Sequence, residues 1–74
     1  MKKYRARCQS ASTGDELENV YDCPGDKEAL EHARVWVALV NKTEDSRFVL
    51  ISLVEIIKPA VAEEVRSVHE GRVK

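Results

Sequence analysis

The residues of this 74-residue chain best suited to nucleophilic or metal chemistry are two cysteines and two histidines. Cys8 and Cys23 are separated by fourteen residues and lack the close CxxC spacing of redox and zinc motifs. His32 and His69 are each single, with no cysteine or carboxylate beside them in a recognised ligand pattern. The sequence therefore predicts no metal site. It predicts two buried free thiols, since cysteine is among the residues most often buried.

Hydroxyl side chains gather before Gly14, but no motif for a nucleophile or for phosphate binding contains them. Ser10, Ser12 and Thr13 precede this glycine without a GxSxG or a Walker pattern, and the chain holds three glycines in all. We therefore predict no catalytic residue, no cofactor-binding residue and no cofactor. On these grounds the protein is expected not to be an enzyme.

Three basic residues near the N-terminus form the one pattern with a nucleic-acid interpretation. Lys3, Arg5 and Arg7 alternate with apolar residues, so a strand would place all three on one face, at a spacing that suits a phosphate backbone. No aromatic stacking partner accompanies them. The net charge of −1 also argues against a general nucleic-acid binder. Pairing with acidic residues of the next segment, Glu18 and Asp22, is the explanation we favour.

A helix is predicted over residues 26–42, with Asp26 as its cap. The side chains expected to face the core are Leu30, Ala33, Trp36, Val37 and Val40. Val35 and Leu39 do not fit this stripe and lie with His32 on an adjacent strip. The apolar surface of the helix is therefore wider than packing against one small sheet requires.

This excess of apolar surface carries the strongest indication of a binding partner. Its rim is charged and consists of Glu28, Glu31 and Lys42. Exposed apolar strips with a polar rim are typical of interfaces, so we interpret the strip as a protein interface. The candidate interface residues are His32, Val35, Trp36 and Leu39. Rotating the helix by one residue would bury two of them and move the excess elsewhere without removing it.

The apolar run over residues 47–58 is predicted to be the central strand. Its five β-branched residues and the proline that follows favour a strand over a buried helix. One face would carry Phe48, Leu50, Ser52, Val54 and Ile56, and the other Val49, Ile51, Leu53, Glu55 and Ile57. Because both faces are apolar, we expect the strand to be sandwiched between two layers or covered by a second subunit.

Residues 3–23 are predicted to form a β-hairpin around a two-residue type II′ turn at residues 14–15. In this register Arg7 faces Asp22, so an opposite-charge pair lies outside and apolar pairs lie inside. A register shifted by two would set Cys8 directly against the second cysteine and lose that charge pair. We favour the first register.

The C-terminal part is predicted to form a short, weakly amphipathic helix over residues 59–70, with Pro59 in its first turn, followed by a frayed tail at 71–74. The expected fold is a single α+β domain over residues 1–74, in the order β-β-α-β-α. It contains a small three-stranded antiparallel sheet with one main helix packed on a face. The pattern does not fix the order of the strands.

Length and composition indicate the class of protein. A domain of this size buries only about 60% of its unfolded surface, so we predict a homodimer in which a second subunit adds stability. The chain has two cysteines, no apolar leader after Met1 and no apolar run near the ~20 residues of a membrane span. A cytoplasmic protein without membrane contact is therefore expected.

From these surfaces we predict a non-catalytic protein-interaction module, a small homodimer that engages another protein as its target. By size and architecture it resembles accessory or inhibitor proteins of bacteria, phages or mobile elements. The alternative is a nucleic-acid-binding protein that uses the basic N-terminal strand. A third hypothesis is an enzyme with its site at the dimer seam, using His32 or Cys23, but no convergent polar cluster supports it.

Overall fold

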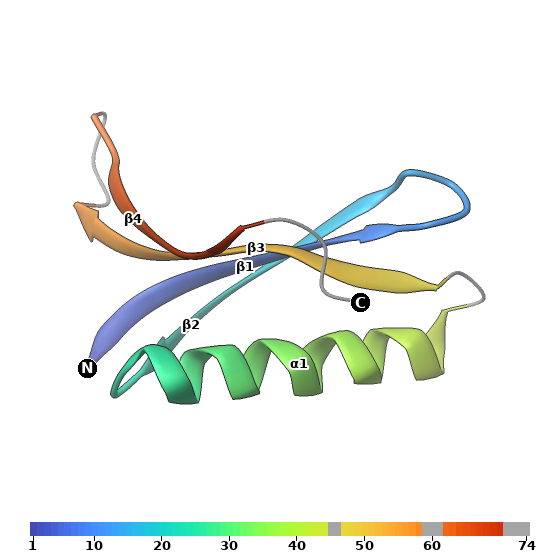
Figure 1. The fold of residues 1–74 in the computed structure, drawn as a ribbon, viewed down its shortest axis with the longest axis horizontal. Helices are drawn as coiled ribbons and strands as arrows, with labels where there is room; N and C mark the ends of the chain where they lie inside the picture. Colours follow the sequence, from blue (N-terminus) through green and yellow to red (C-terminus); the bar gives the residue numbers. More distant parts are fainter. Residues whose placement is uncertain (45–46, 59–61, 71–74) are drawn as a thin grey trace.

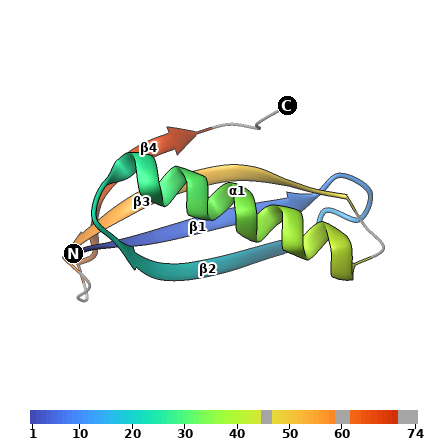
Figure 2. The same ribbon diagram turned by 90° about the horizontal axis from the view of Figure 1, so that it is seen from below.

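A computed structural model gives the structure of residues 1–44, 47–58 and 62–70. Within these ranges the elements are β1 (Lys2–Ser10), β2 (Glu16–Cys23), α1 (Asp26–Thr43), β3 (Phe48–Lys58) and β4 (Glu64–Glu70). The strands form one antiparallel sheet in the order β2-β1-β3-β4, and α1 lies across one face of it (Figure 1, Figure 2). The fold is α+β as predicted, but the described chain has four strands and one helix instead of three strands and two helices.

The C-terminal segment is a strand where the sequence predicted a helix. β4 pairs with the second half of β3 and extends the sheet. Val65 and Val68 are β-branched, and the edge of β3 offers backbone hydrogen bonds that a helix beside it would leave unused. The helix predicted over 59–70 is therefore wrong over β4. Its first residues, 59–61, and the predicted tail at 71–74 lie outside the described residues.

The β1–β2 hairpin consists of the two expected strands, but its register differs from the prediction by four positions. Arg7 faces Glu18 instead of Asp22, and the alternative register with the cysteines opposed is also wrong. The strands are joined by a loop over residues 11–14, in which Gly14 adopts a positive φ of 81°, and not by a two-residue turn. Because the shift is even, every side chain stays on its predicted face, and opposite charges still meet.

A β-bulge at Ile51 divides β3 into two halves. Two consecutive residues of β1 pair with Leu50 and Ser52, so Ile51 is skipped. The bulge brings Leu50 and Leu53 to the same inner face, where both are buried. The predicted alternation over residues 47–58 therefore holds only as far as the bulge.

The core lies between α1 and the inner face of the sheet. Its buried members are Tyr4, Ala6, Cys23, Ala29, Ala33, Leu50 and Leu53. The half-buried Leu30, Trp36 and Val37 of α1 pack around them, which confirms this part of the predicted helix stripe. Cys8 and Cys23 are buried with free thiols, as predicted, and burial raises the pKa of both.

The outer face of the sheet, opposite α1, has no second layer among the described elements (Figure 1). Val49 and Val54 of β3 are half-buried there, on the same face as the basic side chains of β1. Of the two layers expected around the central strand, the described chain supplies one, α1. A covering second subunit remains a prediction.

Candidate functional site

The predicted interface residues lie on the solvent side of α1, toward β2. Val35 and Leu39 are 61% and 55% exposed. The ring of His32 stacks on Tyr21 of β2 with centroids 4.0 Å apart. Trp36 differs from them, because it is half-buried and packs against the core. The structure thus brings His32, Val35 and Leu39 together as an exposed group, here named the apolar strip, and places Trp36 between this strip and the core.

The apolar strip has opposite charges at its two ends. Glu28 lies in the first turn of α1 and Lys42 in the last turn. Each is seven residues from Val35, so the three side chains lie along nearly one line of the helix surface. Neither charged residue forms an ion pair with any residue in the described part of the chain. Both charges are therefore available to a partner.

Next to the apolar strip, β2 forms one edge of the sheet. The amide of Ser10 donates to the carbonyl of Asp15 at 2.7 Å, which fixes the phase of the hydrogen-bond ladder. Alternate residues then direct their backbone groups to the free edge. These residues are Glu16, Glu18, Val20 and Asp22. Since three of the four are acidic, the edge is protected against pairing with a strand like itself.

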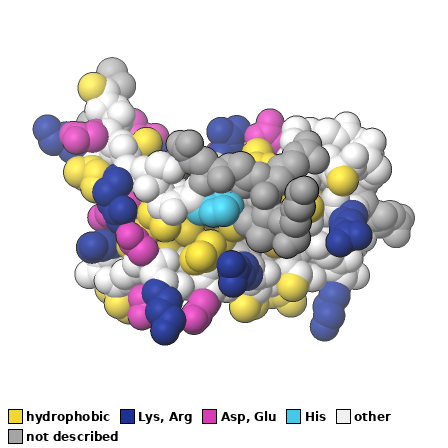
Figure 3. Space-filling view, in the orientation of Figure 1, with side chains coloured by type: hydrophobic (Ala, Val, Ile, Leu, Met, Phe, Trp, Pro, Cys, Tyr) yellow, Lys and Arg dark blue, Asp and Glu magenta, His cyan; other side chains and the backbone are white. Residues whose placement is uncertain are grey.

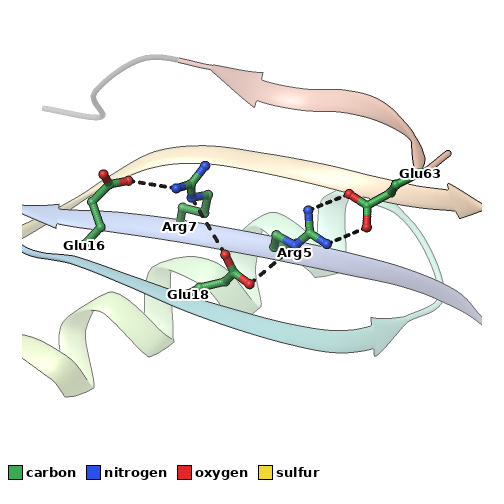
Figure 4. A network of polar contacts seen from close by, with 5 residues as sticks. All are labelled: Arg5, Arg7, Glu16, Glu18 and Glu63. Carbon is green, nitrogen blue, oxygen red and sulfur yellow. Dashed lines mark hydrogen bonds and ion pairs between the residues drawn. The ribbon is translucent and has the colours of Figure 1, made fainter. Parts of the chain in front are cut away.

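Arg5 and Arg7 of β1 are paired with carboxylates on the outer face (Figure 4), whereas Lys3, on the same face, forms no ion pair with a described residue. The Arg5 guanidinium donates two hydrogen bonds, of 2.8 and 2.7 Å, to the Glu63 carboxylate. Arg7 donates to Glu16 at 3.1 Å, and Glu18 lies 3.6 Å from Arg5 Nε and 3.9 Å from Arg7 Nε. The hydrogen bonds raise the pKa of Arg5 and lower that of Glu63.

The expected acidic partners of the basic strand are thus partly correct. Pairing with Glu18 is confirmed, whereas Asp22 faces Lys3 in the register and forms no ion pair with a described residue. Glu16 and Glu63 are partners that the sequence pattern does not indicate. Glu16 is reached only in the true register, and Glu63 comes near β1 only because β4 folds back along β3.

A second ion-pair cluster ties β4 to the beginning of α1. The hydroxyl of the buried Tyr4 donates to Asp26 at 2.8 Å, and Arg66 of β4 donates to Asp26 at 2.6 Å and to Glu55 at 2.8 Å. The Arg66 hydrogen bond, followed by that of Tyr4, lowers the pKa of Asp26. Burial, with Asp26 as the next cause, raises the pKa of Tyr4 to about 12. The cluster is a structural clamp between four elements, β1, α1, β3 and β4.

The prediction that Asp26 caps the helix is wrong. The N-cap residue is Gly25, which makes no side-chain cap hydrogen bond, and Asp26 is the first residue of α1. Its carboxylate is already engaged by Tyr4 and Arg66. A tertiary contact has replaced the local capping contact that the sequence pattern indicates.

A pocket of about 200 Å³ opens on the other flank of α1, against the first half of β3. It is lined by Arg34, Val37, Asn41, Arg47, Phe48, Val49 and Leu50. Figure 3 shows hydrophobic side chains reaching the surface between the sheet and α1, with both basic and acidic side chains around them. No local sequence pattern indicates this pocket, because its two walls come from separate elements.

Asn41 closes the pocket at Phe48, where β1 pairs with one side of β3 and no described strand pairs with the other side. The Phe48 amide donates to Asn41 Oδ1 at 2.6 Å, and Asn41 Nδ2 donates to the Phe48 carbonyl at 3.1 Å. The side-chain amide thus satisfies both backbone groups of Phe48, as a neighbouring strand would. β4 begins to pair with β3 only at Ser52. Leu50 therefore lies beside the pocket, and the side of β3 away from β1 has no partner strand there in the part of the chain that the structure describes.

Residues that might do redox or metal chemistry do not converge in the described ranges. No group of three potential metal-ligating side chains comes together there. The raised pKa values of the cysteine thiols keep them protonated near neutral pH. His69 lies on β4, opposite Leu53, away from the apolar strip of α1. Over the same part of the chain, no helix has the length and apolarity that crossing a bilayer requires.

Comparisons of the chain with protein-family models, with curated proteins and with solved structures found no match. The candidate sites are therefore interpreted from their own geometry. They lie on opposite flanks of α1. The apolar strip is on the β2 side, and the pocket lined by Arg34 and Arg47, here named the basic pocket, is on the β3 side.

Proposed function

We propose that the protein is a non-catalytic interaction module that binds another protein chain through the apolar strip of α1. The exposure of Val35 and Leu39 is the observation that supports this function. The contacts of α1 with the core are made by other residues, so the fold does not need these two side chains. Large apolar side chains that are exposed together without a structural role are typical of interfaces.

The chain that fits the strip is a second copy, packed through its own α1. When two copies of the helix lie antiparallel about a two-fold axis at Val35, Glu28 of each copy lies beside Lys42 of the other, because both are seven residues from the axis. Val35 then packs against its own symmetry mate. The arrangement covers the apolar strip and pairs both unpaired charges.

Strand addition is the other way to build the dimer, and the edge of β2 argues against it. Antiparallel pairing of two β2 strands would bring Glu16, Glu18 and Asp22 of one copy against the same acidic residues of the other. Like charges opposite one another destabilise a strand pair. Helix pairing is therefore the mode that we propose.

Nucleic-acid binding by the basic strand is a weaker candidate. A phosphate backbone would have to displace the carboxylates of Glu16, Glu18 and Glu63 from Arg5 and Arg7. Phosphate contacts contribute to affinity through cationic groups that are free to exchange their counterions. We therefore assign the ion-pair network of Figure 4 to the stability of the outer face.

We also propose a cytoplasmic location and a role as an accessory or inhibitor of a target protein. The two cysteines are free and buried, which suits a reducing compartment. The helix seam is small against the ~800 Å² per partner of a stable interface, so we expect a weak dimer. A weak dimer can exchange its second copy for a target that presents a similar apolar surface.

Charge exchange across the seam tests the proposed dimer. Glu28→Lys or Lys42→Glu sets like charges together at both ends of the seam, so each should weaken dimerisation by a few-fold to about tenfold. The double variant should restore it, because the opposite charges meet again with their positions exchanged. Sedimentation equilibrium at low ionic strength, up to millimolar protein, measures the dissociation constants.

The matched control for charge exchange is Lys27→Glu, which makes the same charge change as Lys42→Glu one residue after the start of α1 and off the strip. It should leave dimerisation unchanged. If the double variant is weaker than both single variants, or if the wild type is a monomer at millimolar concentration, the helix seam is rejected.

A further inference from the structure

We propose that the basic pocket binds the C-terminal residue of a peptide chain, with its carboxylate at Arg34 and Arg47 and its apolar side chain on the pocket floor. The pocket and the apolar strip occupy opposite flanks of α1. The proposal therefore adds a second binding site and does not depend on the dimer.

The two arginines of the pocket differ from the other arginines of the described chain in having no carboxylate partner there. Arg5, Arg7 and Arg66 each form ion pairs with carboxylates. Arg34 and Arg47 form none within the described residues, and both line the same pocket. No acidic side chain is among the described residues that line it. The two guanidinium groups thus offer a site for an anion.

The floor of the pocket favours an anion that carries an apolar group. Val37 is half-buried, and Phe48 and Leu50 are buried. The volume of about 200 Å³ is smaller than the ~300–1,000 Å³ of typical small-molecule sites. It suits one amino-acid side chain more than a whole cofactor.

The position of the pocket favours a carboxylate over a phosphate. Asn41 lies in the last turns of α1, where the helix dipole is negative and disfavours a doubly charged anion. A guanidinium group matches the two oxygens of a carboxylate in a bidentate arrangement. A singly charged carboxylate is therefore the better fit.

The backbone beside the pocket indicates that the carboxylate belongs to a peptide. The backbone groups of Phe48 point to the free side of β3, where Asn41 binds them. Leu50, two residues on, directs its groups to the same side and has no partner strand on that side within residues 1–44, 47–58 and 62–70. An extended peptide can therefore add to β3 at Leu50 while its last residue enters the pocket, as in other cases of β-strand addition.

Amide NMR spectra recorded during titration test this site with N-acetyl-leucine as the probe. We expect millimolar binding, with the largest shifts at Arg34, Val37, Asn41 and residues 47–50. N-acetyl-leucinamide, which lacks the carboxylate, should bind at least about tenfold more weakly. Inorganic phosphate should not reproduce the shifts. If no shifts occur, or if the amide or phosphate acts as N-acetyl-leucine does, the proposal is overturned.

Variants locate the site and separate it from the dimer. Arg34→Gln and Arg47→Gln should each weaken N-acetyl-leucine binding about tenfold, since each removes a charged hydrogen-bond donor. Lys27→Gln removes the same charge outside the pocket and should leave binding unchanged. Leu39→Glu should also leave it unchanged. Loss of binding in either control would contradict the site.

A longer probe tests the peptide source of the carboxylate. Acetyl-Ala-Ala-Leu with a free carboxylate can pair with the backbone of Leu50 and should bind several-fold more tightly than N-acetyl-leucine. Shifts of the Leu50 and Ile51 amides should grow accordingly. Equal affinity of the two probes would reject the peptide and leave a site for a small free acid.

Discussion

The apolar residues that α1 buries completely are smaller than the valine and the leucine that it exposes. The side against the sheet buries Ala29 and Ala33 completely, whereas the solvent side exposes the larger Val35 and Leu39. Small residues let the helix approach the sheet closely, so the large side chains of the strands fill the core. Val35 and Leu39 add nothing to this packing. The fold therefore does not require the apolar strip, which is why we assign it to binding.

Shortening a large side chain of the sheet beneath α1 should have the largest effect. Leu53 is completely buried in the core, so Leu53→Ala removes apolar contacts and leaves a cavity. We expect the free energy of unfolding to fall by about 2–5 kcal/mol. Urea unfolding followed by Trp36 fluorescence measures it. A loss below about 1 kcal/mol would mean that the sheet does not fill the core as described.

Enlarging a small residue on the sheet side of α1 should have the next largest effect. Ala33→Leu forces a bulky side chain against the sheet and should cost about 1–3 kcal/mol. Ala38→Leu is the matched control, because Ala38 is exposed on the same helix and leucine is nearly as good a helix former. It should change stability by less than about 0.5 kcal/mol. Equal losses in both variants would contradict the difference between the two sides.

A smaller effect is expected at the beginning of α1, where Asp26 binds Arg66 and Tyr4. These hydrogen bonds lower the pKa of Asp26 below its unfolded value of about 3.9. Its contribution to stability is therefore complete above about pH 5 and is lost as the pH falls through the folded-state pKa. Asp26→Asn should reduce stability at neutral pH and flatten the acid decline, measured as urea midpoints between about pH 7 and pH 2.

Part of the acid decline should persist in Asp26→Asn, because the pKa of Glu63 is also lowered, by Arg5. The additional change Glu63→Gln should reduce the decline further. An unchanged pH profile in both variants would show that neither the Asp26 cluster nor the Arg5–Glu63 pair contributes to stability.

Most of the elements could be predicted from local patterns, whereas their pairing could not. The helix expected over 26–42 is α1, Asp26–Thr43, because its apolar periodicity is clear. β4 was missed, since a weakly amphipathic segment becomes a strand only when the edge of β3 is beside it. The register of the hairpin and the bulge at Ile51 depend on loop geometry and on the packing of both leucines around the bulge.

The same division holds for the candidate sites. Helical periodicity alone separates Val35 and Leu39 from the core stripe, so the apolar strip could be found in the sequence. The basic pocket could not, because its walls come from the end of α1 and the beginning of β3. The structure shows that every other arginine of the described chain has a carboxylate partner. Only this contrast singles out Arg34 and Arg47 as anion-binding candidates.

The most direct test of the interaction surface is the solution mass of the wild type and of Leu39→Glu over a concentration series, measured by light scattering. We predict a concentration-dependent dimer for the wild type and a monomer for the variant. At concentrations where both are monomeric, the free energy of unfolding should differ by no more than about 0.5 kcal/mol, because Leu39 is exposed. A Leu39→Glu protein that dimerises as the wild type does, or a wild type that stays monomeric at millimolar concentration, would contradict the assignment of the apolar strip to binding.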